Sequence, residues 1–346
     1  MAQTESLSHE LFLSSSPHIA SKVPATALMR NVLIALAPVT IFGVISFGLP
    51  ALLNILVSIV SAVAAESLFR YITKQDIRAK DQSAIVSGLL LALVLPPTTP
   101  LWMTALGAIF AVVVAKEFFG GLGANVFNPA LIGRAFLLMS FPAAVTTWAR
   151  PLGFGTALSD AVSGATPLGI LKLGDSAAAG IQAVGADFAA NKLASSADYW
   201  ATMRTLFIGN HGGCTGETSI LLILAGAVFL LVKKTIDWRA PVTMIGSAFI
   251  LSLVLGMDPL FSVLSGGLIF GAVFMATDYV SAPLTAKGKL IFGCGAGIIA
   301  VLIRKFGNYP EGVSYAILIM NAAAPFLNRL LPKKYGTVPK TKGAAK

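Results

Sequence analysis

Ten apolar segments dominate this chain of 346 residues, and they limit its fold more than any other feature. A helix needs about 20 largely apolar residues to cross the ~30 Å hydrocarbon core of a bilayer. Only 12% of the residues are charged, against roughly 25% in an average soluble domain. This composition excludes a soluble enzyme, a disordered chain and a disulfide scaffold, and it predicts an all-α polytopic membrane protein. The predicted transmembrane segments are 31–49, 51–71, 83–97, 101–117, 127–141, 219–233, 240–257, 260–277, 289–305 and 312–330.

Basic residues predict the orientation of these segments. If ten helices cross the membrane and both tails lie inside, 18 of the 25 Lys and Arg residues fall on the inner side and six on the outer side. Such a bias is typical of cytoplasmic loops. The net charge of +10 is therefore a sign of membrane topology, and it does not indicate a nucleic-acid partner.

The segments divide the chain into five parts. We expect a cytoplasmic N-terminal segment at 1–30, a first membrane repeat at 31–141 and an extracytoplasmic loop at 142–218. A second membrane repeat follows at 219–330, and a basic cytoplasmic tail at 331–346 completes the division.

A weak internal similarity suggests how the two membrane parts are related. Ser87-Gly88-Leu89-Leu90 resembles Gly266-Gly267-Leu268-Ile269, and the stretch 107–118 resembles 295–306. Each part holds five segments, and an odd number inverts the second copy in the membrane. The sequence thus predicts two inverted five-helix repeats.

The outer loop contains one stretch that could carry chemistry, from Asp160 to Gly169. Gly164 permits unusual dihedral angles, Pro167 restrains the chain after Thr166, and small neighbours leave the Thr166 hydroxyl accessible. On spacing alone, this stretch is interpreted as a plain polar loop between a membrane segment and the next element.

A resemblance to a known family suggests a function for this stretch. Asp160-x-x-Ser163-Gly164-Ala165-Thr166 resembles the flavinylation sequence of the respiratory Rnf and sodium-pumping NADH:quinone reductase complexes, and the likeness to Rnf D and the sodium-pump B subunit extends over about residues 16–330. One departure is Cys214, where serine is expected. Further stretches that carry the resemblance are Ser16-Pro17-His18, Met29-Arg30-Asn31-Val32, 81–90, Asn128-Pro129-Ala130, Gly216-Glu217-Thr218-Ser219 and Ala276-Thr277-Asp278.

The resemblance implies a cofactor and partners. FMN would be esterified through its phosphate to Thr166, within the attachment motif of Ser163, Gly164 and Ala165, and a non-covalent riboflavin is implied without assignable residues. Partners would be the other membrane and peripheral subunits, including a second covalently flavinylated subunit and iron–sulfur subunits. A flavin transferase would attach the FMN outside the cytoplasmic membrane. The chain itself has no dinucleotide fingerprint and no iron–sulfur cysteine set.

Other residues have competing interpretations. Arg134, inside the fifth segment, could hold a flavin phosphate or a reduced ring, or it could pair with a helix end; Asp160 is a weaker candidate. The aromatic residues of the outer loop could stack on the flavin or anchor the loop at the membrane interface. These are Trp148, Phe154, Tyr199 and Trp200.

Charged and metal-binding residues receive plainer interpretations. Glu66 lies four residues before Arg70, so we expect an i,i+4 ion pair or snorkelling of the side chain to the interface; a role as an ion-binding carboxylate is the alternative. Lys116, Glu117 and Asp278 are expected to be solvated at helix ends. His211 and Cys214 lie three residues apart without further ligands nearby, so no metal site and no catalytic residue is predicted.

The resemblance therefore implies the membrane subunit of an ion-translocating ferredoxin:NAD oxidoreductase complex, which would relay electrons through FMN and couple them to Na⁺ or H⁺ transport. Two alternatives remain open. One is a solute channel or transporter of the same inverted-repeat architecture, and the other is a quinone-reducing sodium-pump B subunit.

Overall fold

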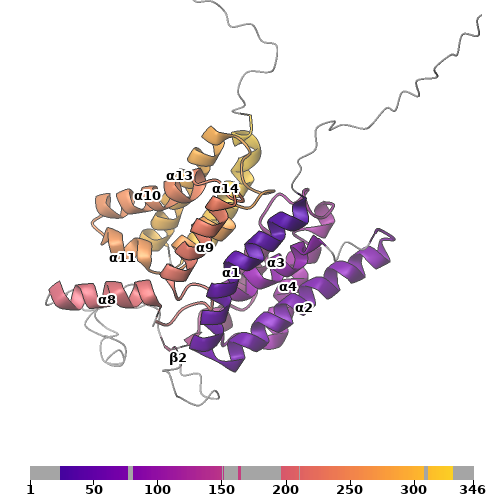
Figure 1. Ribbon diagram of the computed structural model, residues 1–346, viewed down its shortest axis with the longest axis horizontal. Coiled ribbons are helices and arrows are strands. Elements are labelled where there is room, and N and C mark those ends of the chain that lie inside the picture. Colours follow the sequence, from indigo (N-terminus) through magenta and orange to yellow (C-terminus); the bar gives the residue numbers. More distant parts are fainter. Residues whose placement is uncertain are drawn as a thin grey trace, which may run out of the picture.

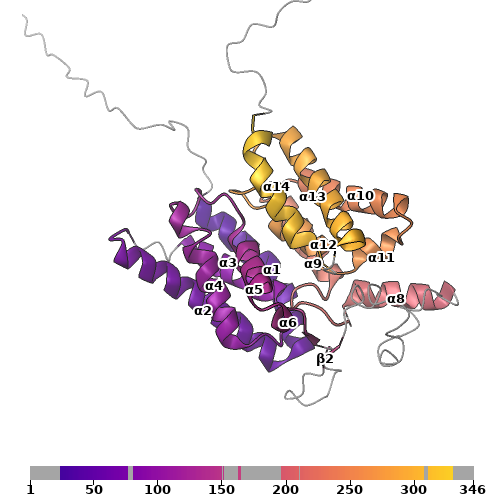
Figure 2. The ribbon, with the colours of Figure 1, turned by 180° about the vertical axis from the view of Figure 1, so that it is seen from behind.

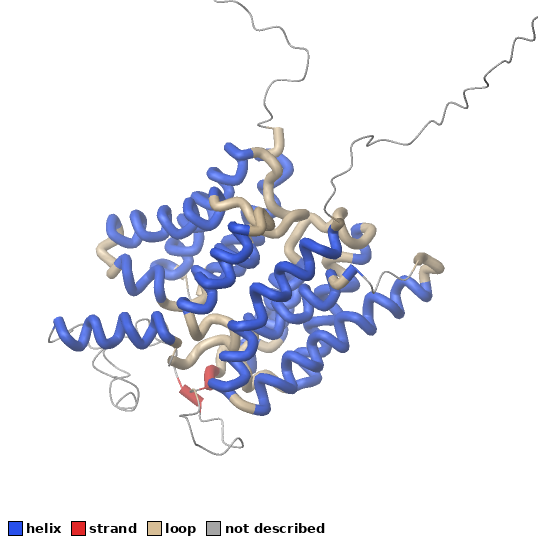
Figure 3. Tube along the Cα trace, in the orientation of Figure 1, coloured by secondary structure: helices blue, strands red, loops and turns tan. Residues whose placement is uncertain are grey.

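The computed structural model describes residues 24–76, 81–149, 151, 163–164, 196–209, 211–307 and 311–329. Helices make up almost all of the regular structure in these residues, with one pair of short strands (Figure 3). Asp160, Ala165 and Thr166 of the predicted flavin loop lie outside them.

The first half of the chain folds into a bundle of helices. α5 begins where the Asn128 side chain accepts hydrogen bonds from the N–H groups of Ala130 and Leu131, with Pro129 in the first turn, which is the position that tolerates proline best. The elements are α1 (Ala25–Phe47), α2 (Leu49–Ile72), α3 (Ser83–Val94), α4 (Leu101–Val113), the 3₁₀ helix η2 (Glu117–Phe119), α5 (Pro129–Ser140) and α6 (Pro142–Val145).

A connecting region and a second bundle follow. The connection contains β1 (Trp148–Ala149), β2 (Ser163–Gly164) and α8 (Ser196–Ile208). The second bundle consists of α9 (Ile220–Val232), α10 (Arg239–Val254), α11 (Pro259–Leu264), α12 (Leu268–Phe270), the π-helix η5 (Gly271–Met275), α13 (Ala286–Phe306) and α14 (Val313–Leu327).

Each predicted apolar segment contains helix. Four helical stretches are long and apolar enough to cross a membrane, and five further apolar helices are shorter. The prediction is wrong in one respect, because 260–277 is not one continuous helix. The chain breaks at Ser265–Gly267, where Gly266 has a φ of 66°, and then continues as α12 and η5. The four long stretches are Ala25–Phe47, Leu49–Ile72, Leu101–Phe119 and Ala286–Phe306.

The packing order of the first half recurs in the second. α2 packs on α3 and α4, and α4 packs on α5; α10 packs on α11 and α13, and α13 packs on α14. The two halves lie side by side (Figures 1 and 2). They meet where α1 packs on α9 and α5 packs on α14. Each of these contacts pairs a helix of the first half with the helix that has the same place in the packing order of the second half.

The two ends of the bundle differ. α1 begins and α14 ends at one end, which we call the tail face (Figure 1). The strand pair and α8 lie at the opposite end, which we call the loop face, and α8 runs across it (Figures 1 and 2). Both described ends of the chain therefore lie opposite the strand pair.

Glycines permit the close contact between α10 and α13. A Cβ atom at Gly293 would overlap the backbone of Ala240, and one at Gly297 would overlap Ser247 Oγ and the backbone of Met244. The spacing Gly293-x-x-x-Gly297 lets two helix backbones approach each other in a lipid environment, where packing replaces the hydrophobic driving force.

We predict that Gly297→Leu separates α10 from α13 and lowers the free energy of unfolding by about 1–3 kcal/mol, because the added atoms meet backbone that cannot move aside. Thermal unfolding of the purified protein in detergent measures this loss. Gly246→Leu on α10 is the matched control, since nothing lies within 4 Å of a Cβ atom there. Equal effects of the two substitutions would contradict the packing argument.

Candidate functional site

Residues 211–219 are buried at the junction of the halves although they form no helix. The N–H groups of Thr215 and Gly216 and the thiol of Cys214 donate hydrogen bonds to the last carbonyls of α3 and its C-cap, at 2.7–3.3 Å. These bonds supply partners that a helix end lacks. Irregular backbone at membrane depth requires such burial within protein. This segment is therefore an integral part of the protein interior.

Arg134, in the middle of α5, is buried between two carboxylates. Its Nη2 lies 2.5 Å from Glu311 Oε2, and its Nη1 lies 3.6 Å from Glu217 Oε1. Cys214 Sγ accepts from Nη2 at 3.8 Å. We call Arg134, Cys214, Glu217 and Glu311 the Arg134 cluster. It joins α5 of the first half to the segments that precede α9 and α14 in the second half.

The cluster has the ligand types of a metal site but already contains a cation. One ligand atom from each of Cys214, Glu217 and Glu311 lies within 4.8 Å of the others. The Arg134 guanidinium lies against the same three groups and supplies the positive charge there. His211 is not a member of this group.

The strand pair connects the predicted attachment motif to this cluster. Trp148 of β1 pairs with Gly164 of β2, and Ala149 pairs with Ser163. Trp148 also lines a cavity of about 20 Å³ together with Arg134 and Glu311. The backbone of the motif thus begins beside the Arg134 cluster at the loop face.

The aromatic candidates fall into different environments. Trp148 is buried, with 7% of its surface exposed, and Trp200 on α8 is 63% exposed. Tyr199 belongs to α8, and Phe154 lies outside the described residues. Of the four, Trp148 is the one that the structure places against the Arg134 cluster.

A second set of buried charges lies in the first half. Lys116 Nζ donates to Glu66 Oε1 at 2.9 Å and to Ser83 Oγ at 2.5 Å. Arg70 Nε lies 3.1 Å from Glu117 Oε2 and 3.8 Å from Glu66 Oε1. The predicted Glu66–Arg70 pair is confirmed.

The expectation that Lys116 and Glu117 are solvated is wrong. Their side chains are 2% and 1% exposed, because each finds an oppositely charged partner on α2. Asp278, the third residue of that expectation, is half-buried.

The internal similarity relates Lys116 to Arg304, and the two cations have similar positions. Arg304 is 3% exposed, and its guanidinium donates to the carbonyls of Ser262 and Ser265. These carbonyls lie in α11 and at the break between α11 and α12. Each cation therefore binds the third helical segment of its own half. Lys116 does so through Ser83, at the start of α3.

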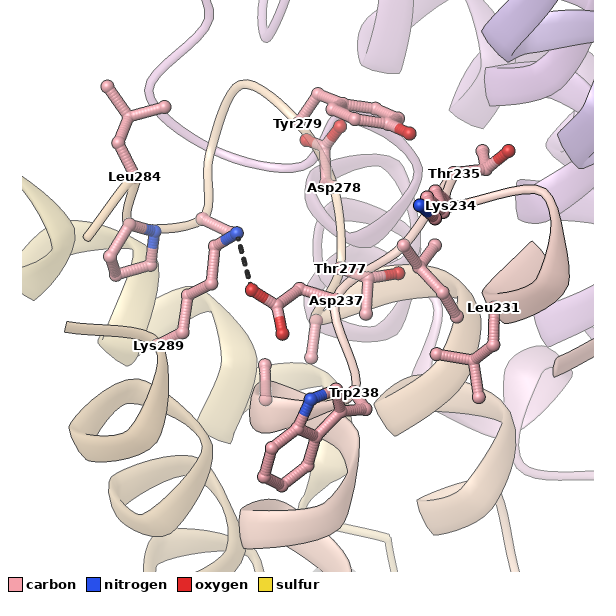
Figure 4. Close-up of a pocket in the computed structure, with 15 residues that line it drawn as sticks. Leu231, Lys234, Thr235, Asp237, Trp238, Thr277, Asp278, Tyr279, Leu284 and Lys289 are labelled. Atoms are coloured by element: carbon pink, nitrogen blue, oxygen red, sulfur yellow. Dashed lines mark hydrogen bonds and ion pairs between the residues drawn. The ribbon is translucent and has the colours of Figure 1, made fainter. Parts of the chain in front are cut away.

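A cavity opens at the tail face, and we call it the tail-face pocket. Its volume is about 450 Å³. Figure 4 shows Lys289 and Asp237 directed toward each other, with Trp238 and Tyr279 on opposite sides. A narrower cavity of about 50 Å³ shares Thr277, Asp278 and Tyr279 with it and is also lined by Asn128.

Three acidic or phenolic groups in this pocket have shifted pKa values. Burial raises the pKa of Asp237, but hydrogen bonds from Arg239 N–H and Lys289, with their charges, outweigh it and hold that pKa below its ordinary value. Burial raises the pKa of Asp278 despite hydrogen bonds from Ser281. Burial also raises the pKa of Tyr279 to about 12. Asp237 thus stays ionised and Tyr279 stays protonated at neutral pH.

Comparison with known proteins identifies the family. The sequence profile of the NQR2, RnfD, RnfE family matches residues 12–336. The chain belongs to this family. The predicted resemblance, made from short motifs, is confirmed.

Similar proteins match over almost their whole length. The D subunit of the proton-translocating ferredoxin:NAD(+) oxidoreductase complex of Clostridium ljungdahlii is 41% identical, covering 97% of this chain and 99% of the relative. The D subunit of the Na(+)-translocating ferredoxin:NAD(+) oxidoreductase complex of Acetobacterium woodii is 41% identical, with 97% and 98% covered. The D subunit of the ion-translocating oxidoreductase complex of Stutzerimonas stutzeri is 40% identical, with 89% and 91% covered.

Sequence reasoning identifies Arg134 but misses its partners. The sequence analysis names Glu217 only as part of a motif, and it does not name Glu311. A usable indication exists, because an intramembrane arginine requires a counter-charge and Glu311 directly precedes the last apolar segment. Which acidic residue supplies the counter-charge to Arg134 depends on contacts between the two halves.

We predict that Arg134→Gln lowers the free energy of unfolding by about 3–5 kcal/mol, because it leaves two buried carboxylates without their cation. Thermal unfolding and the yield of assembled protein measure this loss. Arg239→Gln is the control: its pair with Asp237 leaves the Arg239 side chain 37% exposed, so its loss should change stability by at most about 1 kcal/mol. A similar loss in both variants would contradict the assignment of Arg134 as the buried partner.

Proposed function

We propose that this chain is the D subunit of an Rnf-type complex, relaying electrons through FMN esterified to Thr166 and coupling them to Na⁺ or H⁺ transport. The observation that carries the proposal is the strand pair at the loop face, which holds Ser163 and Gly164 beside the Arg134 cluster. Family membership and the names of the full-length relatives support it. Two relatives of equal identity are named for different ions, so the proposal keeps both.

In this proposal, each residue near the attachment point has a stated task. FMN supplies one-electron transfer when bound. Small residues at Gly164 and Ala165 keep the Thr166 hydroxyl accessible to the transferase. Arg134 remains a proposed contact of the flavin phosphate or reduced ring, and Asp160 a weaker one. Because Arg134 already pairs with two carboxylates, a phosphate there would replace Glu311.

We further propose ten transmembrane helices in two inverted five-helix repeats, with both termini cytoplasmic and the flavin loop periplasmic. Supporting this are the recurring packing order, the contacts between helices of equal rank and the placement of both described ends opposite the strand pair (Figure 1). The basic residues of the tail side favour the cytoplasm for that face.

We propose the tail-face pocket as the site of the second flavin, a non-covalent riboflavin. Its volume of about 450 Å³ lies within the range of roughly 300–1,000 Å³ typical of small-molecule sites. Trp238 and Tyr279 offer aromatic faces to a flavin ring, and threonine hydroxyls offer partners for a sugar-like chain. Asn128 lines the adjoining narrower cavity.

The assignment to a D subunit is preferred over a sodium-pump B subunit because relatives named as D subunits match over 98–99% of their length. Quinone reduction that depends on this chain would favour the B subunit instead. If no flavin is attached to this chain, a function as a solute channel or transporter would be favoured instead.

We predict that Thr166→Val abolishes ultraviolet fluorescence of the denatured chain in a gel, because valine lacks the hydroxyl that forms the phosphoester. Thr156→Val, which removes a hydroxyl from the same predicted loop but outside the attachment motif, is the control and should retain the fluorescence. The host must carry an active flavin transferase. Fluorescence that survives in Thr166→Val would place the flavin elsewhere.

The topology has a separate test. In a variant without native cysteines, Ser195→Cys should react with a membrane-impermeant thiol reagent in intact cells, because it belongs to the predicted periplasmic loop. Lys74→Cys, on the predicted cytoplasmic side, should react only after lysis. Reversed labelling would overturn the orientation and the side of the flavin together.

A further inference from the structure

We propose that Asp237 makes the tail-face pocket selective for an uncharged flavin over its phosphorylated form, because it pairs with Lys289, the pocket cation that would otherwise bind a phosphate. This inference rests on the proposed second flavin site and adds to it the residue that decides which flavin is bound.

The carboxylate of Asp237 pairs with two cations. Its Oδ2 accepts from Arg239 Nη1 at 2.9 Å and from Lys289 Nζ at 3.2 Å, while its Oδ1 accepts from the backbone N–H of Arg239 at 3.1 Å. Figure 4 shows the Lys289 ammonium directed at Asp237 across the pocket. The backbone bond fixes the carboxylate in the position that both cations share.

This arrangement is partly shielded from water. The side chains of Asp237 and Lys289 are 23% and 27% exposed, so their attraction is screened less than that of a surface pair. Lysine binds a phosphate as a point charge. A phosphate entering the pocket would therefore have to compete with Asp237 for Lys289.

The remaining charges of the pocket also act against a phosphate. Its charged lining residues are Lys234, Lys289, Asp237 and Asp278, whose formal charges cancel. Asp278 lies on the wall that the narrower cavity shares, and a phosphate would face both carboxylates. Lys234 is exposed to solvent at the rim.

An uncharged ligand meets none of these penalties. The hydroxyl groups of a ribityl chain can donate to carboxylate oxygens or to Thr277 Oγ1, whose own proton is donated to the Val273 carbonyl, and they can accept from Lys289. Trp238 lies beside the Asp237–Lys289 pair in Figure 4 and offers a face for the ring. The pocket thus suits a polar, neutral chain attached to an aromatic system.

The test compares the flavins carried by purified whole complexes. The non-covalent flavins are released by denaturation, separated by chromatography and counted as riboflavin and FMN per complex. Asp237→Asn keeps the shape of the side chain but removes the charge that holds Lys289, the partner of Asp237 that lines the pocket. We expect the ratio of FMN to riboflavin to rise at least about tenfold, as the gain of one hydrogen bond between charged groups implies. Asp237→Ser removes the same charge and should change the ratio in the same direction.

Two controls make the result specific. Asp237→Asn combined with Lys289→Gln removes the freed ammonium and should return the ratio toward that of the parent. Asp76→Asn removes an exposed carboxylate on the same side and should leave the ratio unchanged.

Two outcomes would overturn the inference in distinguishable ways. An unchanged ratio in both Asp237 variants, with riboflavin still bound, removes the selectivity but leaves the second flavin site. A parent complex without extractable riboflavin removes the second flavin site and the selectivity with it. The covalent FMN at Thr166 stays on the denatured chain and is measured separately.

Discussion

The pairing of Arg134 with Glu311 and Glu217 is the constraint on which the arrangement of the two halves depends. All three side chains are at most 10% exposed, and an unpaired charge in such a place costs several kcal/mol. α5 must therefore stay next to the segments that precede α9 and α14. The same positioning brings β1, and with it the start of the attachment motif, to the loop face beside the cluster.

The irregular parts of the chain follow from a related constraint. Backbone groups inside a membrane protein need partners within the protein. Residues 211–219 find them at the end of α3, and the break before α12 finds them at Arg304. Small residues, such as Gly293 and Gly297, allow the helices to approach closely enough for such contacts. The pocket at the tail face and the cluster at the loop face lie at the two ends of this framework.

How far the sequence predicts this structure depends on the range of the contacts. The helical character of the apolar segments, other than the broken 260–277, and the pair of Glu66 with Arg70 follow from local patterns, and both are confirmed. The prediction that Lys116 and Glu117 are solvated is wrong, because their partners lie on α2, about 50 residues away in the chain. Glu311 lies 177 residues from Arg134, and no local pattern specifies that contact. The break at Ser265–Gly267 likewise depends on a distant arginine.

The central proposal is that Thr166 carries a covalent flavin. Peptide mass spectrometry of the purified complex, from a host with an active flavin transferase, tests it most directly. The account predicts that the peptide containing Thr166 carries FMN through a phosphoester. An unmodified Thr166 peptide, or FMN found on another residue of this chain, would contradict it.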